Sequence, residues 1–221
     1  CSWIVKKIID NHGGLHNRNP CRIHLKTFTL AETEEFLKEK GINWSRYDIA
    51  RCYMITGGIP YYLDYLKKGS QGLNGNIDDL CFSENAVLRE EYSNLFSSLF
   101  KNYKQHVKII ECLAKKNIGL TRKEIIDATK LDDNGDTSDI LQDLEACGLI
   151  RRYNAYGKAD RGSYYQIIDF YTLFYLHYVK GTSLTAKQHW TSIANSSSVA
   201  AWMGNTFEML GIMHIDQMQR V

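Results

Sequence analysis

Apolar residues between positions 105 and 148 recur at helical spacing in three successive stretches. Thr121 is followed three residues later by Glu124, the spacing of a capping box that begins a helix. Thr137 or Ser138 is suited to cap the third stretch, and Gly148 offers a left-handed stop after it. The pattern therefore predicts three helices, with these apolar residues in chain order: Val107, Ile110, Leu113 and Ala114; Ile125, Ile126, Ala128 and Leu131; Ile140, Leu141, Leu144 and Cys147.

Two β-prone runs follow the third predicted helix. Leu149–Tyr153 and Tyr164–Ile168 flank a loop that contains Gly157 and Gly162, an arrangement typical of a β-hairpin. Three helices followed by a hairpin are the elements of a winged helix-turn-helix, which we predict over residues 105–168.

Elsewhere the pattern of apolar positions is mostly helical. Thr29 is placed to cap a helix over Ala31–Glu39, and Pro60 to begin one over Tyr61–Lys67. Further helices are expected at Ser45–Ile55, Leu88–Tyr103, Asp169–Val179 and Ala200–Met218, with a short one over residues 1–10. Asp169–Val179 is apolar nearly all round, which favours a buried docking helix.

Three other stretches have a different pattern. Cys21–Phe28 alternates as a strand does, whereas residues 69–79 have the composition of a loop and residues 180–198 form a polar segment. We therefore expect a mainly α protein with a small β component.

Composition narrows the class of protein. The 221 residues suit one or two domains, and a net charge of +2 is too small to indicate nucleic acid or a membrane surface by itself. Six cysteines without a Cys-x-x-Cys pair predict buried free thiols in a reducing compartment. The most apolar run, Phe170–Val179, is too short to span a bilayer, so we expect a cytoplasmic protein with no membrane partner. The chain begins at Cys1 without Met and ends at Val221 inside a helical pattern, and we expect it to be a fragment of a longer protein.

Several short strings occur together in one order. They are Gly13-Gly14-Leu15-His16-Asn17-Arg18, Phe28-Thr29-Leu30, Gly57-Gly58-Ile59-Pro60-Tyr61-Tyr62-Leu63, Asp169-Phe170-Tyr171, Trp202-Met203-Gly204 and Phe207-Glu208. In this combination the chain resembles the C-terminal part of a prokaryotic P-loop ATPase of the AAA family, of the archaeal-ATPase type related to STAND signalling ATPases.

The resemblance implies four parts in chain order. Residues 1–30 would be a remnant of the α/β P-loop ATPase core, and residues 31–104 a helical lid. The winged helix-turn-helix would follow over residues 105–168. Residues 169–221 would hold the docking helix and the start of a restriction-endonuclease-like domain.

The chain lacks the phosphate-binding loop Gly-x-x-x-x-Gly-Lys-Ser/Thr and the Walker B carboxylates. In the resembled family these motifs lie upstream, so ATP or ADP with Mg²⁺ would be bound by the full-length parent. We expect no nucleotide cofactor and no ATPase activity for this chain alone. The resemblance makes the upstream core its partner and allows a homo-oligomer.

Two sites carry over from the resemblance. Gly57, Gly58 and Pro60 match a Gly-x-Pro signature whose turn packs on adenine; the alternative is a helix–helix turn that needs glycine for positive φ. Arg18 stands where AAA-type ATPases place a phosphate-sensing arginine; the alternative is a surface arginine that caps a preceding helix.

Nucleic acid is a second candidate ligand. Arg151, Arg152, Lys158 and Arg161 alternate with tyrosines around the predicted hairpin, the wing, and could contact DNA weakly. Residues 132–147, the predicted recognition helix, instead contain six carboxylates and no Lys or Arg, so a DNA groove would repel them. We favour an intramolecular docking module, and we keep a DNA-binding winged-helix regulator as the alternative function.

A truncated nuclease-like effector is the other alternative. Glu208 resembles a metal-binding glutamate of the nuclease-like domain, yet one carboxylate does not build a metal site. His12 with His16, and Cys21 with His24, have ligand spacing without a second pair to complete a zinc site. We therefore nominate no catalytic residue and no metal ligand.

Overall fold

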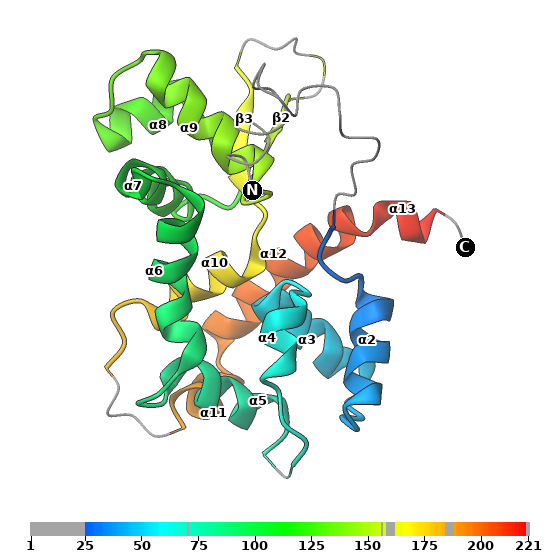
Figure 1. Cartoon of the computed structure of the whole chain (residues 1–221). Helices are drawn as coiled ribbons and strands as arrows, with labels where there is room; N and C mark the ends of the chain where they lie inside the picture. The colour runs from blue at the N-terminus through cyan, green and yellow to red at the C-terminus, as the bar shows by residue number, and fades with distance from the viewer. Residues whose placement is uncertain (1–24, 70, 156, 158–161, 184–187, 220–221) are drawn as a thin grey trace, which may run out of the picture. The chain divides into compact units, whose positions relative to one another are not determined.

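The computed structural model describes residues 25–69, 71–155, 157, 162–183 and 188–219, and these residues are mainly helical with one small antiparallel sheet of three strands (Figure 1). The prediction of a mainly α protein with a small β component is confirmed at this level. The helix expected over residues 1–10, Arg18, Lys158 and Arg161 lie outside the described residues.

The described residues form two compact units. The hairpin unit comprises residues 93–169 together with Leu25, and the helical unit comprises residues 26–92 and 170–219. The divisions fall at Tyr92/Ser93 and at Asp169/Phe170. The four functional parts expected from the sequence remain predictions.

The hairpin unit contains three helices and the sheet. Its elements are α7 (Tyr103–Leu113), β1 (Leu120–Thr121), α8 (Arg122–Thr129), α9 (Gly135–Ala146), β2 (Ile150–Tyr153) and β3 (Tyr164–Ile167). β3 lies between β1 and β2 and is antiparallel to both, with Leu120 opposite Tyr165 and Ile150 opposite Ile167. The predicted helices and hairpin are confirmed. β1 was not predicted, because a two-residue strand leaves no period in the sequence.

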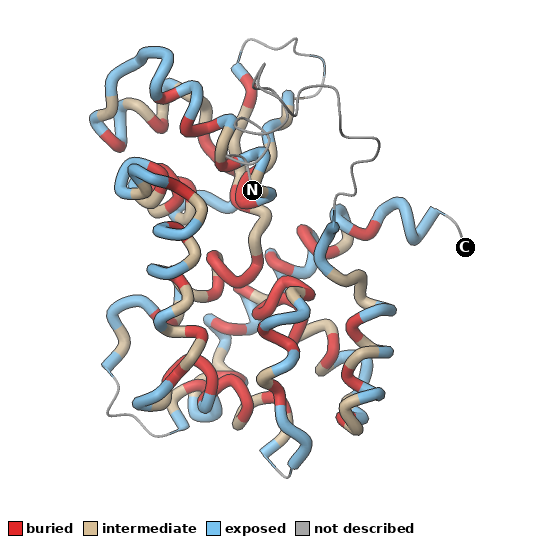
Figure 2. The backbone as a smooth tube through the Cα atoms, viewed as in Figure 1, coloured by how far each residue is buried: buried red, intermediate tan, exposed pale blue. Residues whose placement is uncertain are grey.

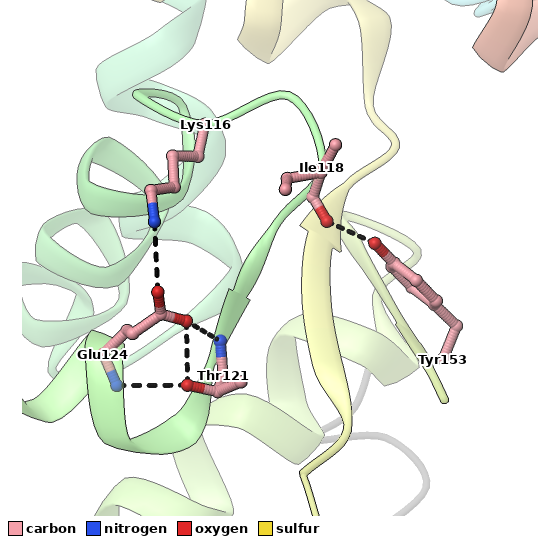
Figure 3. A network of polar contacts seen from close by, with 5 residues as sticks. All are labelled: Lys116, Ile118, Thr121, Glu124 and Tyr153. Atoms are coloured by element: carbon pink, nitrogen blue, oxygen red, sulfur yellow. Dashed lines mark hydrogen bonds and ion pairs between the residues drawn. The ribbon is translucent and has the colours of Figure 1, made fainter. Parts of the chain in front are cut away.

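Local signals set the helix ends in this unit. Thr121 and Glu124 form the predicted capping box, with the Thr121 N–H donating to Glu124 Oε2 at 2.8 Å (Figure 3). Lys116 Nζ lies 3.0 Å from Glu124 Oε1. The bonds from Thr121, with Lys116 beside them, lower the pKa of Glu124 to about 2. The cap predicted for α9 was wrong: Asn134 accepts from the Thr137 N–H at 3.1 Å, so α9 begins before Thr137.

The helical unit is built from two segments of the chain. The first holds α2 (Leu30–Glu39), α3 (Arg46–Thr56), α4 (Pro60–Asp64), α5 (Gly72–Ile77), the π-helix η2 (Asp78–Phe82) and α6 (Val87–Leu99), which runs on into the hairpin unit. The second holds α10 (Phe170–Phe174), the π-helix η3 (Tyr175–Val179), α11 (His189–Ile193), α12 (Ser197–Met213) and α13 (Ile215–Met218).

Several predicted starts are confirmed here. Thr29 caps α2 in a capping box with Glu32, Ser45 caps α3, and Pro60 is the first residue of α4. Gly57 ends α3 in the left-handed conformation with φ 68°, which a glycine adopts without a steric penalty.

Other predictions for this unit were wrong. Residues 69–79 were expected as a loop, but residues 72–79 belong to α5 and η2. They are helical because Leu73 and Ile77 are buried and the Asn76 side chain bonds to backbone groups of Lys67 and Gly72. The polar segment contains α11, whose first N–H groups are bound by Asp78.

Three further boundaries differ from the prediction. The helix expected to reach Tyr103 ends at Leu99, and the last predicted helix is interrupted at His214. Residues 25–28 are not part of a strand, since Phe28 makes an isolated backbone bond to Gly58 and not a ladder.

Large apolar residues are buried in the helical unit, where Figure 2 marks buried positions along the backbone. The buried set includes Tyr53, Ile55, Leu63, Phe170, Tyr171, Phe174 and Trp190. Tyr171 donates its hydroxyl hydrogen bond to the Leu88 carbonyl and so joins α10 to α6. The cysteines that the structure describes, Cys52, Cys81, Cys112 and Cys147, are free, and burial raises the pKa of Cys52 to about 12.

Candidate functional site

The end of α3 and the turn between α3 and α4 bind the backbone of Phe28, near the point where the chain enters the helical unit. The Phe28 N–H donates to the Gly58 carbonyl at 2.9 Å, and the Tyr53 hydroxyl donates to the Phe28 carbonyl at 2.7 Å. Both backbone groups of Phe28 are therefore held by the α3–α4 region. We call these three residues the Phe28 joint.

Gly58 is required at this joint for two reasons. Its φ is 65°, a conformation that side chains with a Cβ rarely adopt. A Cβ built at Gly58 would also lie 2.4 Å from the Tyr53 ring and 2.5 Å from the Phe28 carbonyl oxygen. The close approach of Phe28 to the turn thus depends on the absence of a side chain at this position.

His214 ties the end of α12 to the start of α2. The Leu30 N–H donates to His214 Nε2 at 3.1 Å, and His214 Nδ1 lies 3.0 Å from the Leu210 carbonyl oxygen. Because Nε2 accepts, the ring hydrogen belongs on Nδ1, which then donates to Leu210. The ring also packs edge-on against Tyr53, with centroids 5.2 Å apart. Burial raises the pKa of Tyr53, which keeps its hydroxyl a hydrogen-bond donor.

The other side of the same turn is open. Pro60 and Tyr61 are exposed at the start of α4, whereas Gly57 and Gly58 are buried. Tyr65 donates its hydroxyl hydrogen bond to the Tyr61 oxygen at 3.0 Å. A rigid, exposed proline that lacks an N–H donor is suited to contact with a flat ring.

The predicted basic residues of the wing differ in their contacts and exposure. Arg151 Nε donates to Gln166 Oε1 at 2.8 Å, and its guanidinium lies 5.4 Å from the centre of the Tyr153 ring. Arg152 is exposed on β2. Tyr153 in turn donates to the Ile118 carbonyl (Figure 3). Arg151 therefore helps to hold the strands of the sheet together.

The turn before α9 and the helix itself are acidic. Asp132 and Asp133 precede the helix and Asp136, Asp139 and Glu145 lie on it, all five exposed, while Asp143 is partly buried. Asp136, Asp139 and Asp143 share one face of α9. Arg122 Nε pairs with Asp133 at 2.8 Å, and His106 Nε2 lies 3.8 Å from Asp143. A cavity of about 560 Å³ lies along this face, between α9 and the start of α7. This surface favours cationic groups over phosphates.

The structure thus brings Gly57, Gly58 and Pro60 together in one turn of the helical unit, whereas Arg151 and Arg152 belong to the hairpin unit. Glu208 is exposed on α12. Tyr53, Asp78 and His214 were not nominated from the sequence. The bonds from Tyr53 to Phe28, Asp78 to Trp190 and His214 to Leu30 each join residues at least 25 apart along the chain, so no local spacing identifies them.

Three negative findings complete the description. Within the described ranges, no group of three or more His, Cys, Asp or Glu side chains is arranged to hold a metal ion. Among the same residues, no helix is both long and apolar enough to cross a membrane. Neither a protein-family model, nor a curated protein, nor a solved structure gives a significant match to this chain.

Proposed function

We propose that this chain is the lid and winged-helix portion of a regulatory ATP-binding ATPase of the AAA/STAND type and is not catalytic on its own. The observation that carries the proposal is the Phe28 joint, which fixes the Gly57–Pro60 turn to the chain arriving from residues 1–24. In an ATPase of this kind, the arriving chain would belong to the nucleotide-binding core. The proposed setting is the cytoplasm, with the upstream core as intramolecular partner and a homo-oligomer as the working form.

The topology of the hairpin unit supports the winged-helix part of the proposal. Its order is helix α7, strand β1, helices α8 and α9, then the hairpin of β2 and β3. The strand order β1-β3-β2 makes the first short strand an edge partner of the hairpin. These are the connections that a winged helix-turn-helix requires.

The joint also suggests how a lid would follow the nucleotide. Phe28 is bonded through both backbone groups to Gly58 and Tyr53, so a shift of the chain before Phe28 would pull on the α3–α4 turn. Pro60 is exposed two residues after Gly58. In this proposal its ring packs on the adenine, while Mg²⁺ and the phosphates are held by the upstream core.

The adenine contact is tested by measuring the ADP affinity of the Pro60→Ala variant. The measurement uses calorimetry on the full-length protein. Loss of the proline ring should weaken ADP binding roughly tenfold, the equivalent of about 1.4 kcal/mol. Loss of the fixed φ alone would lower the melting temperature slightly and leave the affinity unchanged.

Gly135→Ala is the matched control. It alters the first residue of α9, in the hairpin unit, where an added Cβ meets nothing within 4 Å. This variant should keep the wild-type ADP affinity. Equal affinities of wild type and Pro60→Ala would remove the adenine contact from the proposal and leave a structural turn.

DNA binding by the wing is the alternative function, and the exposed carboxylates of α9 weigh against it. If the hairpin unit is a docking module, replacing Arg151 and Arg152 together by Ala should change duplex binding little at physiological salt. A sequence-specific complex that survives about 200 mM salt and is lost in the double variant would reverse this ranking. Electrophoretic mobility shift over a salt series makes the measurement.

A truncated nuclease-like effector has less support. Glu208 is a single exposed carboxylate on α12, and a divalent metal site needs several oxygen ligands. We therefore do not propose nuclease activity for this chain.

A further inference from the structure

A second concave site lies in the helical unit, away from the Gly57–Pro60 turn. It is a cavity of about 570 Å³ between α3 and the segment from the end of α11 to α12. Its size falls within the range of small-molecule sites, roughly 300–1,000 Å³. Apolar residues dominate its walls, among them Met54 on α3 and Met203 on α12.

The space exists because α12 has small residues where it faces α3. Ala200 and Gly204 both line the cavity and are exposed, and a Cβ added at Gly204 would meet no atom within 4 Å. A glycine inside a helix is less favourable for stability than an alanine. At this position the missing side chain leaves the cavity open.

Two aromatic side chains stand at the cavity. Tyr47 on α3 is 72% exposed and Phe207 on α12 is 59% exposed, and both belong to the lining. Exposed rings together with methionine thioethers make a surface that favours flat, apolar ligands. Such ligands would bury the parts of these rings that now contact solvent.

The positive charge of Arg51 in the lining favours apolar ligands that carry a negative charge. Arg51 is the one charged side chain among the described residues that line the cavity, and no carboxylate is among them. Its side chain is 11% exposed; Nη2 donates to Asn74 Oδ1 at 3.2 Å, and Nη1 lies 3.5 Å from Asp48 Oδ1. Asp48 also accepts from the Ser45 hydroxyl at 2.8 Å. A guanidinium has five N–H donors, so these contacts leave it able to bind an anion as well.

We propose that this cavity binds an amphiphilic anion, a small aromatic acid whose ring lies between α3 and α12 and whose carboxylate pairs with Arg51. The apolar walls supply the contact area, and the partly desolvated guanidinium supplies the preference for a negative charge. A cationic ligand is disfavoured because the lining offers no opposing charge.

The test uses a pair of probes that differ in charge, 2-naphthoate and neutral 2-naphthamide, titrated calorimetrically into the full chain. The wild type should bind the carboxylate at least tenfold more tightly than the amide. Arg51→Met, which keeps a long apolar side chain, should bring the two affinities to about the same value. Equal wild-type affinities for both probes, or binding of neither, would overturn the proposal.

Two further variants test the place of binding. Gly204→Leu and Ala200→Leu should fill the cavity and reduce the affinity for both probes at least tenfold. Leucine is a better helix former than glycine, so Gly204→Leu should melt no lower than the wild type. Gly211→Leu is the control on the same helix, because Gly211 does not line the cavity and its added Cβ meets only the end of Met218 at 3.8 Å. This control should bind 2-naphthoate as the wild type does; unchanged binding in both cavity-filling variants would show that the probe sits elsewhere.

Discussion

The contacts inside the two units join residues that lie at very different separations along the chain. In the hairpin unit, the contacts span from a few residues to a few tens: Thr121 and Glu124 are three apart, Arg151 and Gln166 are 15 apart, and Tyr153 and Ile118 are 35 apart. In the helical unit, Asp78 binds α11 across 112 residues, and Leu30 binds His214 across 184. The helical unit thus depends on its second segment returning to the first.

This difference has a consequence for folding. Closing a long loop costs more conformational entropy than closing a short one. The contacts between the two segments of the helical unit must offset that cost, because they hold the second segment against the first. We therefore expect single substitutions at long-range contacts of the helical unit to have larger effects than comparable changes in the hairpin unit.

Asp78 is the strongest test of that expectation. Its buried carboxylate accepts from the Trp190 N–H at 2.6 Å, the Thr191 N–H at 3.0 Å and the Thr191 hydroxyl at 2.5 Å. Asp78→Ala leaves these donors without the carboxylate and should lower the free energy of unfolding by about 4 kcal/mol. Urea denaturation measures the change.

The neighbouring residue provides the control. Asp79 is exposed, so Asp79→Ala should change stability by less than about 0.5 kcal/mol. If both variants lost stability equally, the effect would come from the charge of η2 and not from the bonds to α11.

The substitutions Gly58→Ala and Gly148→Ala compare the two units at similar backbone strain. Gly58→Ala combines a φ of 65° with contacts of 2.4 and 2.5 Å, and should destabilise by about 3 kcal/mol. Gly148→Ala, in the hairpin unit, meets a similar φ of 73° but no atom within 4 Å, and should destabilise by about 1 kcal/mol. The excess measured for Gly58 by denaturation reports the steric clash at the Phe28 joint. A difference near zero would mean that Phe28 can move away from the turn without loss.

The two capping boxes allow the finest comparison. Bonds from Thr29 lower the pKa of Glu32, and bonds from Thr121 lower the pKa of Glu124, which also has Lys116 beside it and reaches about 2. A carboxylate with a lowered folded-state pKa stabilises the fold above its unfolded pKa, and this contribution is lost as the pH falls. For Glu124 the loss should occur as the pH falls from the ordinary glutamate pKa of 4.5 to about 2.

Melting temperatures from pH 6 to pH 2 check this sign. Glu124→Gln should flatten the acid slope of the wild type, since glutamine does not titrate. Glu32→Gln should flatten it less, because the bonds from Thr29 lower the pKa of Glu32 without help from a lysine. An acid slope unchanged in Glu124→Gln would assign the pH dependence to other carboxylates.

The sequence alone determined the features that arise within a few residues. Thr29, Ser45 and Thr121 begin helices, Gly57 ends one and Pro60 begins the next, because caps and positive φ are properties of the local backbone. The same reasoning predicted the hairpin of β2 and β3. It also placed Gly57, Gly58 and Pro60 in one turn, the part of the candidate site that a short segment specifies.

Only the tertiary structure decided the rest. Residues 72–79 are loop-like in composition, and they are helical because Leu73 and Ile77 are buried in the core and Asp78 binds α11. The Phe28 joint and the bond from Leu30 to His214 join residues whose separation along the sequence does not predict a contact. Burial and long-range hydrogen bonds outweigh local propensity there, since an unsatisfied buried polar group costs more free energy than an unfavourable helix residue.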